Sequence, residues 1–112
     1  RAISGTATLT DTNVYDNQAA TDGGGLYIFS TATLTDTNVY DNRAANAGGG
    51  LYIQNTATLT NINMYANLAA RGGGLYLQGT ATLTNTNVYE NQADEEGCDI
   101  NSNDYLMLRN VS

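Results

Sequence analysis

The sequence predicts an all-β protein, a right-handed parallel β-helix (solenoid) of about four coils with 24–25 residues each. Three observations lead to this prediction. A stretch beginning TATLT recurs along the chain, apolar and polar residues alternate inside each copy, and most copies carry a Gly triplet. Tandem repeats of this length are typical of solenoids, in which each unit buries its apolar side against the next unit.

The repeat sets the predicted boundaries. The stretch TATLTDTNVYDN at Thr6 recurs from Thr31, Thr56 and Thr80, at intervals of 25, 25 and 24 residues. We treat the chain as a single solenoid, residues 1–112, with repeats 6–30, 31–55, 56–79 and 80–104 and partial coils 1–5 and 105–112. The missing residue of the third repeat falls just before its Gly triplet, which predicts a loop that tolerates changes in length.

The alternation inside each copy has a period of two residues, which is typical of strands rather than helices. In TATLT, Ala and Leu alternate with Thr, so Ala and Leu are expected to face the interior. Stacking in register predicts a core of apolar columns. The columns are Ala7, Ala32, Ala57, Ala81; Leu9, Leu34, Leu59, Leu83; Val14, Val39, Met64, Val88; Leu26, Leu51, Leu75; and Ile28, Ile53, Leu77.

Two Asn positions occur in every copy. We expect Asn17, Asn42, Asn67 and Asn91 to lie at a turn, where stacked amides bond to one another and to turn backbone. Asn13, Asn38, Asn63 and Asn87 form a second column, for which a similar ladder and simple exposure are both open. The Gly triplets are expected where the chain bends into the next strand, because glycine permits positive φ and close backbone approach.

Composition excludes several classes of partner. Asp and Glu outnumber Arg, Lys is absent, and the formal net charge is −7, so nucleic acid and anionic membranes are not expected partners. The apolar runs are only a few residues long, so no membrane insertion is predicted. Cys98 is the only cysteine and cannot form an internal disulfide.

Two short motifs carry a resemblance to a known family. Gly24-Gly25-Leu26-Tyr27-Ile28 and Val14-Tyr15-Asp16-Asn17, with their copies, resemble the GGA[ILV] and FxxN segments of chlamydial polymorphic outer membrane protein repeats and related pectin-lyase-like β-helices. The chain departs at the Phe position, which is Val or Met, and at the Ala after the glycines. The resemblance implies a right-handed parallel β-helix in a secreted or surface-displayed, adhesin-like protein, hence an extracellular or cell-surface location.

The threonines of TATLT are expected to form a flat outer lattice. Such an array resembles the ice-binding face of β-solenoid antifreeze proteins, and it could equally carry O-linked sugars. Thr is also a good exposed strand residue that duplication would copy. The candidate residues are Thr6, Thr8, Thr10, Thr31, Thr33, Thr35, Thr56, Thr58, Thr60, Thr80, Thr82 and Thr84.

Two tyrosine columns are expected to point outward. They contain Tyr15, Tyr40, Tyr65, Tyr89 and Tyr27, Tyr52, Tyr76. Stacked ladders of this kind cover strand surface, and exposed aromatic rings also bind sugars or partner protomers. Asn110-Val111-Ser112 is a candidate N-glycosylation sequon at Asn110.

The sequence predicts no enzyme and no catalytic, cofactor-binding or metal site. There is no His or Lys to act as a base, and Asp11, Asp16, Asp36 and Asp41 recur by duplication rather than occurring once. The leading expectation is a structural or adhesive extracellular solenoid that self-associates through open coil ends into a head-to-tail filament. An ice-binding solenoid and a carbohydrate-binding adhesin segment are the alternatives.

Overall fold

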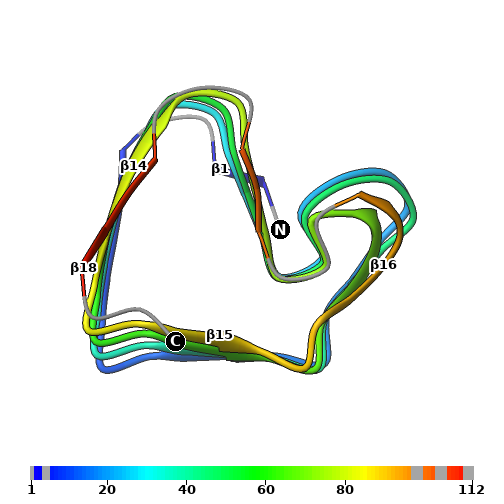
Figure 1. Cartoon of the computed structure of the whole chain (residues 1–112), viewed down its shortest axis with the longest axis horizontal. Helices are drawn as coiled ribbons and strands as arrows, with labels where there is room; N and C mark the ends of the chain where they lie inside the picture. Colours follow the sequence, from blue (N-terminus) through cyan, green and yellow to red (C-terminus); the bar gives the residue numbers. More distant parts are fainter. Residues whose placement is uncertain (1, 4–5, 97–99, 103–105, 110–112) are drawn as a thin grey trace.

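The computed structural model describes residues 2–3, 6–96, 100–102 and 106–109, with side chains described for residues 6–94. These residues form strands joined by bends and irregular segments, with no helix among them. The strands build four parallel sheets, here called A, B, C and D, which the chain visits once per turn. Figure 1 shows the coil end-on, with one strand of each turn stacked on the strand of the turn before.

Sheets A and B each have five strands. The strands of sheet A are β1 (Ala2–Ile3), β5 (Leu26–Ile28), β9 (Leu51–Ile53), β13 (Leu75–Leu77) and β17 (Ile100–Ser102). The strands of sheet B are β2 (Ala7–Thr10), β6 (Thr31–Thr35), β10 (Thr56–Thr60), β14 (Thr80–Thr84) and β18 (Leu106–Arg109).

Sheets C and D each have four strands. The strands of sheet C are β3 (Asn13–Tyr15), β7 (Asn38–Tyr40), β11 (Asn63–Tyr65) and β15 (Asn87–Tyr89). The strands of sheet D are β4 (Gln18–Ala19), β8 (Arg43–Ala44), β12 (Leu68–Arg71) and β16 (Gln92–Glu96).

The predicted fold class is confirmed, with a small correction to the coil count. Repeats 6–30, 31–55 and 56–79 lie wholly within the described residues and make about three full turns, whereas repeat 80–104 contains residues outside them. The coil is right-handed, because in Figure 1 the chain runs anticlockwise through sheets A, B, C and D while later turns lie nearer the viewer. This hand is the usual one for parallel crossovers.

The strands pair in the register that the repeat predicts. Leu59 pairs with Leu34 on one side and with Leu83 on the other, and the Ala and Val/Met columns pair in the same way. The partial coils follow the same register, since Ile3 pairs with Ile28 and Leu108 pairs with Leu83. The apolar columns form one continuous buried cluster.

Left-handed residues mark both ends of each sheet C strand, a feature that the sequence analysis missed. The corner before sheet C has φ of 48–55° at Asp11, Asp36, Asn61 and Asn85. The corner after it has φ of 52–56° at Asp16, Asp41, Ala66 and Glu90. Asp and Asn tolerate this conformation better than other residues with a side chain, which accounts for their prevalence at these two positions.

Between sheets D and A the chain doubles back in a hook, formed by residues 20–25, 45–50 and 72–74 (Figure 1). The residue missing from the third repeat falls just before this hook, where Ala70 and Arg71 belong to strand β12 rather than to the predicted loop. The backbone N–H groups of Ala70 and Arg71 both donate to the carbonyl of Asn46, at 2.9 Å each, and the pairing of β12 with β16 is irregular between Ala69 and Arg71. The shorter third repeat is therefore absorbed without disturbing the next strand.

Candidate functional site

The inner Asn ladder, Asn17, Asn42, Asn67 and Asn91, lies between sheets C and D and confirms the predicted amide stack. Asn42 and Asn67 are each only 1% exposed. The side-chain nitrogen of Asn42 donates to Oδ1 of Asn67 at 3.0 Å, and the backbone N–H of Asn42 donates to the same oxygen at 3.1 Å. Asn42 Nδ2 also donates to the carbonyl of Val14 in the preceding turn, at 3.0 Å.

The same contacts recur along the ladder. Asn17 donates from its backbone and side chain to Oδ1 of Asn42, and Asn67 donates in the same way to Oδ1 of Asn91. Each oxygen thus accepts two hydrogen bonds from the preceding turn. A buried amide is tolerated only when its hydrogen-bonding groups are satisfied, and no buried side-chain nitrogen or oxygen among the described residues lacks a partner.

The outer Asn ladder consists of Asn13, Asn38, Asn63 and Asn87. The two predicted alternatives, exposure and a ladder, both hold, because these residues face outward and also bond to one another. Asn63 Nδ2 donates to Oδ1 of Asn38 at 2.9 Å, and Asn38 Nδ2 donates to Oδ1 of Asn13 at 3.0 Å. Here each later turn donates to the earlier one, which is opposite to the inner ladder. The amide dipoles of the two ladders therefore oppose each other along the axis.

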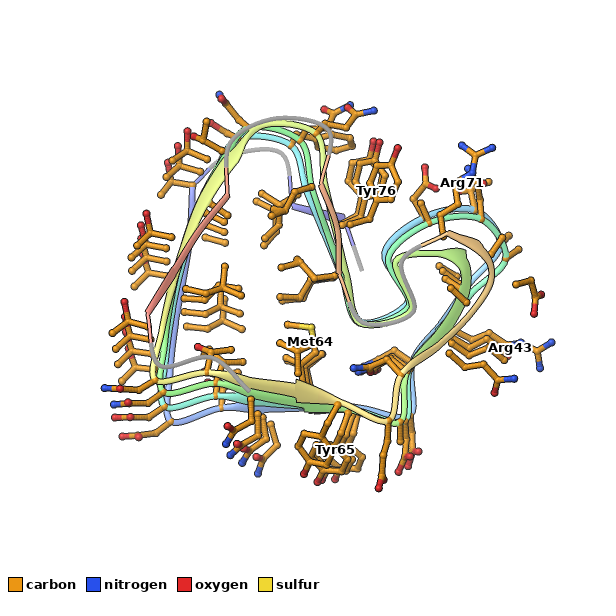
Figure 2. The ribbon with its side chains drawn as sticks, viewed as in Figure 1. Arg43, Met64, Tyr65, Arg71 and Tyr76 are labelled. Atoms are coloured by element: carbon orange, nitrogen blue, oxygen red, sulfur yellow. The ribbon has the colours of Figure 1, made fainter. Side chains whose placement is uncertain are left out.

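The outer Tyr ladder consists of Tyr15, Tyr40, Tyr65 and Tyr89 and lies on the more exposed face of sheet C, as predicted. Figure 2 shows Tyr65 pointing outward from this sheet. Adjacent ring centroids are 5.1–5.2 Å apart and the planes differ by 2–13°. Because the rings stack on one another, each ring face inside the ladder is partly covered by its neighbour. A sugar stacking on a ring would find the most exposed faces at the ends, where Tyr15 is 49% and Tyr89 41% exposed.

The second Tyr column differs from the prediction that it points into solvent. Tyr52 and Tyr76 are buried and form a small cluster with Ala47, against which Tyr27 packs. Figure 2 shows Tyr76 between sheet A and the hook. The side chains do leave the main core, but the hook folds back over them. The two-residue alternation of the strand could not reveal this cover, because it depends on how the following bend is placed.

Enclosure by the hook changes the acidity of these phenols. Burial, with smaller effects from Tyr27 and Asp22, raises the pKa of Tyr52 to about 12. Burial and the Asp22 carboxylate also raise the pKa of Tyr27. Asp22 itself accepts hydrogen bonds from Asn46 Nδ2 at 3.0 Å and from the backbone of Ala47 at 3.1 Å. Tyr27 and Tyr52 are therefore neutral at physiological pH.

The threonine array occupies the outer face of sheet B. In these strands the Ala and Leu side chains are more buried than the Thr side chains, so all the candidate threonines share one side of the sheet. Pairing places Thr58 opposite Thr33 and Thr82, and the columns on either side align in the same way. Asp36 and Asn61 border the array at the corner, where Asn61 Nδ2 donates to Asp36 Oδ1 at 3.0 Å.

The first turn leaves a hollow at the N-terminal end of the stack. It has a volume of about 330 Å³ and is lined by the ends of three core columns, Leu9, Val14 and Leu26, and by Asn17. Within the described residues, no donor reaches Oδ1 of Asn17, whereas the equivalent oxygen of Asn42 accepts two hydrogen bonds. Among the strands that the structure describes, β1 to β4 pair on one side only.

A larger hollow of about 630 Å³ runs along sheet D and was not anticipated from the sequence. Alanines from successive turns form much of its wall, with Arg43 and Asp94 as its charged residues. Figure 2 places Arg43 on the outer side of sheet D. The sequence signal for this hollow was the repeated Ala-Ala pair that follows the inner Asn ladder, because small side chains on a strand leave space beside it.

The remaining predicted positions add little to the description of a site. Asn110 and Cys98 lie outside the described residues. The four aspartates considered as catalytic candidates lie at the two corners that flank sheet C. Among the described residues, no group of three or more His, Cys, Asp or Glu could hold a metal ion. In that same part of the chain, no helix has the length and apolar character needed to cross a membrane.

Comparisons with known proteins add no family to this description. No protein-family model, no curated protein and no solved structure matches the chain. The resemblance to polymorphic outer membrane protein repeats therefore stays a prediction.

Proposed function

We propose that the chain is a non-enzymatic structural solenoid of the extracellular space or cell surface that stacks head to tail with further copies of itself. The observation that carries the proposal is the in-register contact between successive turns, which pair strand by strand, share one apolar core and link their inner Asn side chains. A turn of another copy offers the same strand edges, apolar columns and amides, so it can continue the stack in the same way.

The chemistry of the end face favours another coil over an unrelated ligand. A coil of the same repeat supplies apolar side chains to the core columns, an amide to Asn17 and a parallel strand to each edge. Unpaired strand edges are strong templates for pairing with another chain. Because the two ends of the stack differ, the contact is heterologous and does not close into a ring by symmetry, so repeated stacking grows a filament.

Sedimentation velocity across a range of concentrations tests this proposal. The unaltered chain should show species larger than a monomer that grow with concentration, and Leu9→Lys should remove them by placing an ammonium group in the hollow. Thr8→Lys adds the same charge to the outer face of the same strand and should leave association unchanged. A single monomeric species of the unaltered chain at every concentration overturns the proposal, as does equal disruption by both variants.

A second candidate function, ice binding, is favoured by the register of the threonine columns. In-register pairing of four strands gives the outer face of sheet B a regular grid of hydroxyl and methyl groups. Thermal hysteresis measurements test it directly. Thr58→Tyr at the centre of the grid should abolish activity while Asn63→Tyr on sheet C should not, and absence of hysteresis in the unaltered chain excludes this function.

A further inference from the structure

The outer Tyr ladder brings four phenol rings together on the more exposed face of sheet C. Adjacent ring centroids are 5.1–5.2 Å apart, and adjacent planes lie within 13° of parallel. Tyr15 and Tyr89 at its ends are exposed, and Tyr40 and Tyr65 between them are partly exposed. Figure 2 shows Tyr65 on the outside of the coil. The ladder therefore combines contact between phenols with access from solvent.

The second Tyr column has the same contacts without the same access. The ring centroids of Tyr27 and Tyr52 are 4.5 Å apart, and those of Tyr52 and Tyr76 are 5.0 Å apart. Tyr52 and Tyr76 are buried together with Ala47 of the hook. One molecule thus contains two tyrosine stacks of similar spacing, of which only the outer one is open to a reagent in solution.

Neighbouring exposed phenols react in a characteristic way with one-electron oxidants such as a peroxidase with hydrogen peroxide. The oxidant takes one electron from each of two phenols, and each phenol releases its hydroxyl proton to water. The two phenoxyl radicals then form a C–C bond between ring carbons next to the oxygen-bearing carbons. The hydrogens of those two carbons move to the oxygens, which restores both phenols. In balance, two tyrosines and one hydrogen peroxide give one dityrosine and two waters.

We propose that the outer Tyr ladder is a site of oxidative cross-linking, at which dityrosine bonds join successive turns of the solenoid. Strand pairing in register holds the partner rings side by side. Coupling within one chain therefore has a high effective concentration and outpaces coupling between dilute chains. The site requires an oxidant of the peroxidase class and is independent of head-to-tail stacking.

The exposed ends of the ladder decide which rings couple. A bond between two stacked rings requires one ring to tilt toward the other, and a ring at an exposed end has the most room to do so. Tyr15 therefore couples to Tyr40. At the other end, Tyr89 couples to Tyr65.

Mass spectrometry after proteolysis can identify these bonds. Cleavage before Asp and after Arg places Tyr15 in residues 11–15 and Tyr40 in residues 36–40, and it separates Tyr65 from Tyr89. The full chain is treated at low concentration with a haem peroxidase and hydrogen peroxide. We expect residues 11–15 joined to residues 36–40, two hydrogen atoms lighter than the two fragments together, from a chain that still runs as a monomer on a denaturing gel.

Two Tyr→Phe variants separate the two tyrosine stacks. Tyr40→Phe removes the ladder neighbour of Tyr15, so Tyr15 should lose its cross-link while the bond between Tyr65 and Tyr89 still forms. Tyr52→Phe is the matched control in the second Tyr column and should leave both bonds unchanged. Circular dichroism melting checks that both variants fold. Oxidation of the urea-unfolded chain should spread the cross-links to Tyr52, because neither the ladder nor the hook persists there.

Three results would overturn the cross-linking site. One is the absence of the joined fragment from the folded chain under conditions in which free tyrosine dimerises. Another is coupling of Tyr52 in the folded chain at the same yield as Tyr40, because the hook then gives no protection. The third is the same set of products from folded and unfolded chains, which would show that the ladder does not direct the reaction.

Discussion

The side-chain amide of Asn67 lies in the space next to the α-carbon of Gly50. A Cβ on Gly50 would be 3.2 Å from Cγ of Asn67, 3.0 Å from a methyl group of Val39 and 2.7 Å from the carbonyl oxygen of Gly74. Gly25 has the same relationship to Asn42. The last Gly of each of the first two triplets therefore packs against the inner Asn ladder, because a side chain there would crowd both the buried amide and a backbone carbonyl.

Replacing this glycine should destabilise the whole stack. We expect Gly50→Ala to lower the free energy of unfolding by about 1–3 kcal/mol, the usual cost of overpacking a closely packed site. Gln54→Ala, at an exposed position in the same turn, is the control and should stay close to the unaltered chain. Chemical denaturation followed by circular dichroism measures both, and an unchanged midpoint for Gly50→Ala would refute the close packing.

The two Asn ladders should contribute by different amounts to the free energy of unfolding. Asn42→Ala removes the side-chain acceptor for Asn17, takes one of the two donors from the buried Oδ1 of Asn67 and takes the side-chain donor from the carbonyl of Val14. Each unsatisfied buried group costs about 1–3 kcal/mol, so the variant should lose at least about 2 kcal/mol. Asn38→Ala in the more exposed outer ladder should lose less than about 1 kcal/mol. Equal losses in denaturant titrations would contradict the assigned burial.

The second corner of sheet C offers a stabilising substitution. Ala66 has a φ of 56° in a column otherwise made of Asp16, Asp41 and Glu90. A left-handed conformation costs a residue with a Cβ about 1–2 kcal/mol, and Asn relieves part of that cost through local hydrogen bonds. Ala66→Asn should therefore raise the melting temperature and Asp41→Ala should lower it. Opposite shifts would show that the corner is not left-handed.

The buried phenol of Tyr52 makes stability depend on alkaline pH. Its folded pKa of about 12 exceeds the ordinary tyrosine value of 10.0. A raised pKa means that the unfolded chain loses the proton first, so the contribution of Tyr52 is complete below pH about 10 and is lost as the pH rises to about 12. Phenolate absorbance and thermal melts across this range should show the late titration. Tyr52→Phe should remove it, and a titration near pH 10 in every tyrosine would contradict enclosure by the hook.

The sequence was sufficient to predict the repeat, the strand register and the core. Leu34 and Thr33 differ in burial because they point to opposite faces of one strand, and the sequence shows this alternation directly. The cover over Tyr52 was not visible, because it depends on the path of the hook. The left-handed corner at Asp41 was missed for a related reason, since Asp before Asn is equally common in ordinary turns.

The inner Asn ladder shows both what the sequence could predict and what it could not. Its position at a turn and its amide stacking followed from an Asn at the same place in every copy. Its near-complete burial at Asn42 did not, because a polar residue is read as exposed unless the partners that satisfy it are known.

Nuclear magnetic resonance of the side-chain amides tests the in-register stack most directly. If successive turns lie on one another as described, the NH₂ protons of Asn42 should show nuclear Overhauser contacts to both Asn17 and Asn67 and should exchange slowly with solvent. Rapid exchange of these protons, or contacts only to residues within the same repeat, would contradict the stacked solenoid.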